Sequence, residues 1–134
     1  MHYAYIVDLT FDASTQKAVD ETREALAATG IGELQLTGFI RPHVSLVAGI
    51  GVDAEAALPL LAAYAKATPA FPLTLSYLGL FNPRNHTVVY LGVTTTVALL
   101  EMHRAFHHTF APFIEEAWAY YTEGVWVPHC TLVL

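Results

Sequence analysis

Two short segments of this chain repeat one order of residue types, and this repeat is the strongest restriction on its fold. One segment reads RPHVSLVAG and the other VPHCTLVL, so Pro, His, a hydroxyl residue and Leu recur in the same order around His43 and His129. Both are rich in β-branched and apolar residues, as strands are. Proline cannot donate a hydrogen bond to a neighbouring strand, so each motif is expected at the start or edge of a strand.

The alternation of side chains along a strand gives each motif two different faces. Residues two positions apart share a face, so His43 lies beside Ser45 and His129 beside Thr131. The residues between and after them are apolar, and Cys130 is expected to point away from the histidine. Each strand is therefore predicted to bury one face and to present an imidazole and a hydroxyl group on the other.

Two such imidazoles favour acid–base chemistry, because the unperturbed pKa of histidine is about 6.5. If both face one cleft, one imidazole can accept a proton while the other donates one across a single phosphorus centre. The two hydroxyl groups would hydrogen bond to phosphate oxygens, and no metal ion or other cofactor is required. A single histidine in a strand is more often structural, but two motifs that agree in four residue types favour a functional pair.

The rest of the sequence alternates between strand and helix patterns. We expect strands at residues 2–10, 43–50, 71–81, 86–93 and 125–134, and helices at residues 15–30, 53–67 and 95–117. Ser14 and Asp53 are expected to cap the first two helices, and Gly30 to end the first. Pro59 is expected to kink the second helix or to mark a later start, and Pro112 to break the third.

The order of these elements, β-α-β-α-β-β-α-β, predicts an α+β fold. Residues 82–85, with the sequence NPRN, are typical of a turn and predict a hairpin between two of the strands. No linker or low-complexity segment interrupts the chain, so we expect one domain over residues 1–134. If the repeated motif is structural, that domain has two weakly similar lobes, each with one motif strand.

Charge and composition restrict the partners and the location. The net charge is −6, and the six basic residues are scattered singly, which argues against an extended nucleic-acid groove. A small anionic ligand held by local groups remains compatible. No apolar run is long enough to span a membrane, the first ten residues do not resemble a signal peptide, and Cys130 has no partner for a disulfide. These features favour a cytoplasmic protein.

Three further groups of residues are weaker candidates. Arg41 would point to the motif face, toward an anionic substrate, if its strand begins that early. Trp126 could stack on a nucleobase, although packing in the core is the default for an aromatic residue in this chain. His103 and His107 have the helical spacing of some zinc sites, but a solvated or partly buried helix face is the preferred interpretation.

The motifs PHVSL and PHCTL resemble the twin H-x-(T/S)-hydrophobic motifs of the 2H phosphoesterase superfamily, and VWVPHCTL resembles its 2′-5′ RNA ligase-like branch. This resemblance implies a bilobal, pseudo-twofold arrangement of antiparallel sheets flanked by helices. It implies a metal-independent hydrolase with cyclic phosphodiesterase activity on a 2′,3′-cyclic phosphate, or with activity on a 2′-5′ phosphodiester of a nucleotide or small RNA end. It makes His43 and His129 the catalytic pair, and Ser45 and Thr131 phosphate-binding residues.

Members of that superfamily continue beyond the second motif, whereas this sequence ends three residues after Thr131. We therefore expect a chain that lacks C-terminal elements, or that obtains them from a second copy in a homodimer formed through the exposed C-terminal strand region. Two other functions stay open at this point. One is a non-catalytic module that binds a phosphate-bearing nucleotide in the same cleft, and the other is a metal-dependent activity based on the histidines at 103, 107 and 108.

Overall fold

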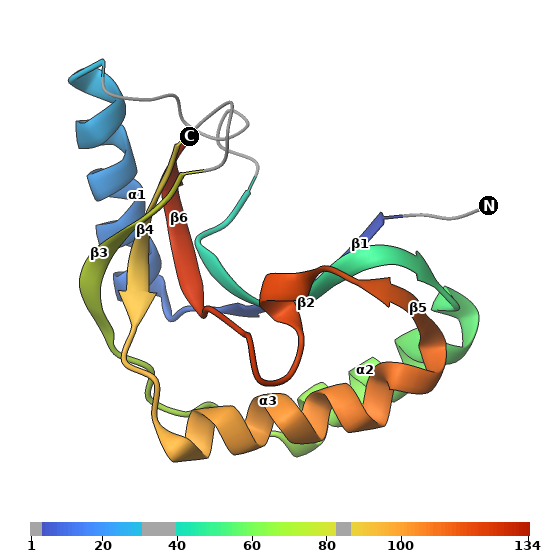
Figure 1. Ribbon diagram of the computed structural model, residues 1–134. Helices are drawn as coiled ribbons and strands as arrows, with labels where there is room; N and C mark the ends of the chain where they lie inside the picture. Colours follow the sequence, from blue (N-terminus) through green and yellow to red (C-terminus); the bar gives the residue numbers. More distant parts are fainter. Residues whose placement is uncertain (1–3, 31–39, 83–86) are drawn as a thin grey trace. The chain divides into compact units, whose positions relative to one another are not determined.

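The computed structural model describes residues 4–30, 40–82 and 87–134, and these residues form an α+β fold, as predicted. They contain two three-stranded sheets and three α-helices (Figure 1). The chain divides into two compact units. The first unit comprises Met1–Val7, Ser45–Leu73 and Thr95–Val127, and the second comprises Asp8–Val44, Thr74–Thr94 and Pro128–Leu134.

The sheet of the first unit has the strand order β1-β2-β5, formed by β1 (Ala4–Thr10), β2 (His43–Val52) and β5 (Ile114–Ala117). The last residues of β1 and the first two of β2 belong to the second unit. β2 is the middle strand, and all six residues from Val44 to Gly49 are buried. This explains its nearly continuous apolar sequence, because a strand covered on both faces does not need polar alternation.

β5 is a correction to the prediction that a helical stretch continues to residue 117. The helix α3 (Val97–Phe110) is followed by a short 3-10 turn, Ala111–Phe113, that contains Pro112. The chain then becomes extended and pairs with β2 in antiparallel register, with Ala117 opposite Gly49. The break at Pro112 was predicted correctly, but the backbone groups that follow it bond to β2, a partner that is distant in sequence.

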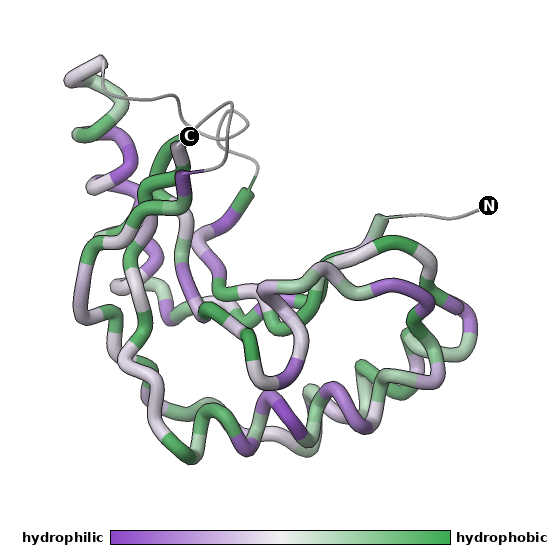
Figure 2. Tube along the Cα trace, in the orientation of Figure 1, coloured by the Kyte–Doolittle hydropathy of each residue, from purple (hydrophilic) through white to green (hydrophobic). Residues whose placement is uncertain are grey.

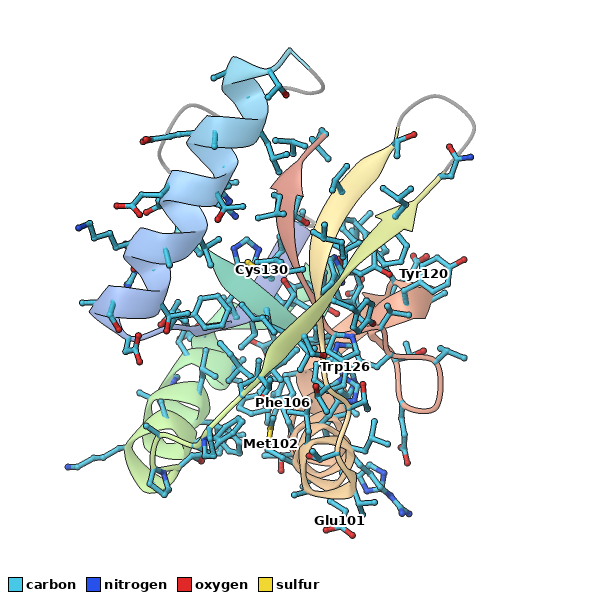
Figure 3. All side chains as sticks on the ribbon, turned by 90° about the vertical axis from the view of Figure 1, so that its left-hand side faces the viewer. Glu101, Met102, Phe106, Tyr120, Trp126 and Cys130 are labelled. Atoms are coloured by element: carbon cyan, nitrogen blue, oxygen red, sulfur yellow. The ribbon has the colours of Figure 1, made fainter. Side chains whose placement is uncertain are left out.

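The helices of the first unit pack through aromatic side chains. In α2 (Ala54–Ala67), Asp53 is the N-cap, as predicted, and the helix runs on through Pro59. The ring of Tyr64 in α2 meets the rings of Phe106 and Phe110 in α3 edge to face, with centroids 5.5 and 5.9 Å apart. Figure 3 shows Glu101 on the side of α3 away from Phe106, and Figure 2 shows hydrophobic and hydrophilic residues interleaved along α3.

The sheet of the second unit has the strand order β3-β4-β6, formed by β3 (Leu75–Phe81), β4 (Val88–Val93) and β6 (His129–Val133). β3 and β4 are antiparallel neighbours, as the predicted hairpin requires, although residues 83–86 of the turn, including Arg84, lie outside the described residues. β6 pairs with β4 so that His129 lies opposite Gly92 and Thr131 opposite Tyr90. The helix α1 (Ala13–Ala28) packs against β6.

The N-cap of α1 is Asp12 and not the predicted Ser14. The Asp12 backbone is extended, and its Oδ1 accepts a hydrogen bond from the backbone N–H of Thr15 at 2.7 Å. Ser14 already lies inside the helix, where its hydroxyl donates to the same Oδ1 at 3.2 Å. Both residues are suitable caps, and the point at which the chain leaves β1 selects between them. Gly30 follows the helix with φ 77°, as expected for a terminating glycine.

The apolar residues of β6 are better covered than the sequence suggested. Leu132 and Val133 are buried, whereas Leu134 is exposed. In the described part of this sheet, the large exposed hydrophobic side chains lie on β3 instead, at Tyr77, Leu78 and Leu80. None of the helices in the described part of the chain combines the length and the apolar character that crossing a membrane requires.

Candidate active site

The first motif fixes the imidazole of His43 at the start of β2. Its Nδ1 lies 2.6 Å from the backbone carbonyl oxygen of Arg41. A carbonyl oxygen can only accept a hydrogen bond, so Nδ1 carries the proton and donates it. In the neutral ring Nε2 then bears the lone pair, and it is the nitrogen through which His43 can exchange a proton. The side chain is half-buried, so the ring combines a fixed tautomer with access from outside.

The second motif places His129 against an aromatic group formed by Tyr77, Phe81 and Tyr90. The ring centroid of His129 is 4.8 Å from that of Phe81 and 5.2 Å from that of Tyr90. Its cross-strand partner is Gly92, and the ring of Tyr77 occupies the space that a Cβ would take there. The aromatic group therefore limits the orientations of the His129 ring.

His43 and His129 both belong to the second unit. The backbone amide of His43 lies near the thiol of Cys130, the residue after His129. Burial raises the pKa of this thiol, while the charge of Arg23 and the amide of His43 act in the opposite direction. Figure 3 shows Cys130 on the side of β6 that faces α1. Cys130 is fully buried, which agrees with the expectation that it points away from the histidine side of its strand.

Arg23 connects the second motif to the residue directly before the first motif, and sequence reasoning did not identify it. Its Nε and Nη2 donate to the carbonyl oxygen of Thr131 at 3.1 and 2.7 Å, and its Nη1 donates to that of Ile40 at 2.9 Å. Arg23 is 7% exposed and shares the buried face of α1 with Val19, four residues earlier. The sequence offered one signal for this position: residues four apart share one face of a helix, so Arg23 lies on the same face as the apolar Val19.

The two motif hydroxyls lie in different units. Thr131 is half-buried on β6, in the second unit, while Ser45 belongs to the first unit and is 8% exposed. The backbone carbonyl of Ser45 accepts a hydrogen bond of 3.0 Å from the indole Nε1 of Trp126. The binding of phosphate by these two hydroxyls stays a prediction.

The strand that carries His43 begins at that residue, so Arg41 precedes it and does not lie on the motif face as part of the strand. The guanidinium of Arg41 donates to Oε1 of Gln16 from Nε at 3.2 Å and from Nη2 at 3.1 Å. Its backbone carbonyl orients His43, a contribution that the sequence does not reveal. Contact between the Arg41 side chain and a substrate stays a prediction.

Trp126 packs inside the first unit. It is 8% exposed, and one face of its indole is stacked on His103 with centroids 3.8 Å apart and planes 2° from parallel. A stacked nucleobase would have to use the opposite face, so core packing is the role for which the structure provides contacts. Substrate binding by Trp126 stays a prediction.

His103 and His107 are more deeply buried than the expected helix face, with 1% and 9% of their surfaces exposed. The Nε2 of each ring lies 2.9 Å from the carbonyl oxygen of Leu46, so both Nε2 atoms carry protons and donate them. These two nitrogens tie α3 to β2. Within the described residues, no group of three or more His, Cys, Asp or Glu side chains is arranged to hold a metal ion.

Because His103 is buried, we expect the free energy of unfolding to decrease in acid. Burial, together with the nearby His107, lowers the pKa of His103 from 6.5 to about 4, although its bonds to backbone carbonyls and the charge of Glu123 oppose this shift. Between these two values the unfolded chain binds more protons than the folded protein, so stability decreases as the pH falls. We expect a free energy of unfolding lower by about 2 kcal/mol at about pH 5 than at about pH 8 from this group, measured by urea denaturation.

The matched variants are His103→Gln and His108→Gln. Glutamine at position 103 can place an amide nitrogen near the carbonyl of Leu46 without titrating, so most of this pH dependence should disappear. His108 is exposed on the same helix, so its replacement leaves the buried ring of His103 in place and serves as the control. An undiminished pH dependence in His103→Gln would assign the acid sensitivity to other groups.

Comparison with known proteins gives one positive result. The family model of the 2′-5′ RNA ligase superfamily matches residues 11–134, which include both motifs and nearly the whole chain. No curated protein and no solved structure matches the chain. The twin motifs predicted this family, and the protein belongs to the 2′-5′ RNA ligase superfamily, the group of the 2H phosphoesterases.

Proposed function

We propose that this protein is a metal-independent phosphoesterase that acts on a nucleoside 2′,3′-cyclic phosphate, or on a 2′-5′ phosphodiester of a nucleotide or small RNA end. His43 and His129 form its acid–base pair. The observation that carries the proposal is the hydrogen bond of 2.6 Å from His43 Nδ1 to the Arg41 carbonyl, next to the second motif. It leaves Nε2 of an accessible imidazole for proton transfer, as a general base or acid requires.

In hydrolysis of the cyclic phosphate, one imidazole takes a proton from water as the water oxygen attacks phosphorus. The bond between phosphorus and one ribose oxygen breaks, and the other imidazole protonates that oxygen. The product is a phosphomonoester with a free ribose hydroxyl, and the pair ends with its protonation states exchanged. In the formation of a 2′-5′ bond from the same cyclic phosphate, a 5′-hydroxyl takes the place of water, its oxygen bonds to phosphorus, and the 3′ oxygen leaves and is protonated. In the reverse of that reaction, cleavage of the 2′-5′ bond to the cyclic phosphate, the two histidines exchange roles.

The other residues of the site would stabilise the phosphate. Hydroxyl donors at Thr131 and Ser45 can bond to non-bridging oxygens, on which negative charge increases during the reaction. The aromatic group beside His129 excludes water from one side of that ring, which strengthens its electrostatic interactions with the substrate. The scattered basic residues and the net charge of −6 favour a small substrate over long RNA.

The test is the incubation of the four nucleoside 2′,3′-cyclic phosphates and a 2′-5′-linked dinucleotide with the protein, with and without EDTA, followed by chromatography and ³¹P NMR. We expect conversion of at least one substrate to a phosphomonoester, at a rate that EDTA does not change. The rate should show a bell-shaped dependence on pH, because one imidazole must be neutral while the other is protonated.

Two outcomes would contradict this function. Ligand binding without turnover would indicate a binding module for phosphate-bearing nucleotides. Loss of turnover in EDTA, with recovery on addition of a divalent cation, would indicate a metal-dependent reaction.

A further inference from the structure

Arg23 has a set of contacts that packing alone does not require. It extends from α1 and is 7% exposed, yet its guanidinium directs three nitrogens at two backbone carbonyl oxygens. The carboxylate of Asp20 is 3.9 Å away from the guanidinium, and its side chain is about half exposed. Burying a cation costs free energy unless its donors are hydrogen bonded. An apolar side chain could fill this buried position, beside Val19 and against β6, without that cost.

One carbonyl belongs to the second motif segment, and the other belongs to the residue directly before the first. Ile40 lies three residues before His43, and Thr131 lies two residues after His129. The planar guanidinium holds both at once, with two bonds to Thr131 on one edge and one bond to Ile40 from the remaining nitrogen. Its geometry is rigid, so it fixes the separation and orientation of the two segments.

The backbone amide of His43 lies near the thiol of Cys130 in the same region. The three hydrogen bonds of Arg23 connect the two segments there, so we expect its guanidinium to supply most of the restraint.

We propose that Arg23 is a positioning residue that sets the distance and orientation of His43 relative to His129. Its effect on rate rests on the proposed acid–base function of the two histidines. Acid–base catalysis across one phosphorus atom needs both imidazoles in place at once, and a misplacement of about 1 Å can reduce the rate by about 100-fold. Arg23 does not contact the substrate in this account.

The experiment compares Arg23→Met, Arg23→Lys and Val19→Ala with the wild-type protein. Methionine fills the buried space without donating, and lysine keeps the charge without the planar set of donors. Val19 is 3% exposed on the same face of α1, so Val19→Ala loosens the helix while it leaves the three hydrogen bonds of Arg23 intact. Steady-state kinetics on a nucleoside 2′,3′-cyclic phosphate are measured well below the thermal midpoint of each variant.

We expect kcat of Arg23→Met to fall by roughly 30- to 100-fold while KM changes less than about threefold, because positioning affects the transition state more than binding. Arg23→Lys should recover less than about one tenth of the lost rate. Val19→Ala should keep kcat within about twofold of the wild-type value, even if it lowers the thermal midpoint as much as Arg23→Met does. Equal losses of kcat in Arg23→Met and Val19→Ala would overturn the proposal and leave a structural role.

A second measurement does not depend on activity. In NMR spectra of the labelled protein, the nuclear Overhauser contact between the His43 amide proton and the Cys130 β protons reports the separation of the motifs. We expect it to weaken or vanish in Arg23→Met and to persist in Val19→Ala. Its persistence in both would refute the positioning role. If the wild-type protein shows no turnover, the proposed function fails, and this contact alone decides whether Arg23 holds the motifs together.

Discussion

Replacing His43 or His129 by alanine is expected to lower kcat/KM for a nucleoside 2′,3′-cyclic phosphate by about 10³-fold or more. General acid and general base catalysis each contribute about 10²- to 10⁴-fold, and the reaction needs both protons to move. Residues that act together give losses that do not add, so the double variant should be little slower than either single one. Initial rates and a chemical quench assay at high enzyme concentration measure the residual activity.

His43→Asn separates the orientation of the ring from its chemistry. The asparagine amide can still donate to the carbonyl of Arg41, in place of the Nδ1–H bond of 2.6 Å, but it offers no group at the position of Nε2. The activity of His43→Asn should therefore be as low as that of His43→Ala. His108, exposed and bonded to Glu123 at 3.2 Å, is the control, and His108→Ala should keep its activity within about twofold. Activity in His43→Asn close to that of the wild type would remove His43 from the acid–base pair.

Gly49→Ala is expected to give the largest loss of stability, about 3 kcal/mol, with a decrease in thermal midpoint of roughly 10 °C or more. A Cβ at position 49 would overlap the backbone oxygen of Glu116 on the neighbouring strand β5, and it would also approach the hydroxyl of Tyr5. The first of these atoms is backbone, so the clash cannot be relieved by rotation of a side chain. Relief requires β5 to move away from the middle strand.

The matched control for that variant is Gly124→Ala. Gly124 has φ 85°, so alanine is strained there, but its Cβ would have no atom within 4 Å. The expected loss is about 1 kcal/mol, from the left-handed backbone alone. Thermal unfolding followed by circular dichroism gives both values. A loss in Gly49→Ala no larger than that in Gly124→Ala would show that β2 and β5 adjust to the added carbon.

Local patterns were sufficient for most of the elements. Asp53 caps α2 as predicted, and Gly30 ends α1, because a capping carboxylate and a left-handed glycine act on residues next to them in the chain. The errors arose where distant residues decide. Residues 114–117 were assigned to a helical stretch and form β5, since their backbone pairs with β2, more than sixty residues earlier.

The same division applies to the candidate site. The repeated motif selected His43 and His129 as candidates and predicted the family, because the residue types that define each motif are close together in the sequence. The sequence did not reveal that the carbonyl of Arg41 orients His43, that Phe81 and Tyr90 pack against His129, or that Arg23 joins the two segments. Each of these is a contact made by a backbone group or by a residue outside the motifs.

The sequence by itself determined the α+β class, the family and the choice of His43 and His129 as candidate residues, since short-range alternation and the residue types of the motifs are enough for these. Tertiary structure alone decided the environments of charged and titrating groups. Arg23 and His103 look like solvated residues of helices, and both are buried because α1 packs on β6 and α3 is tied to β2. Burial changes the energy of a charge through its distant neighbours, and a sequence does not state which neighbours those are.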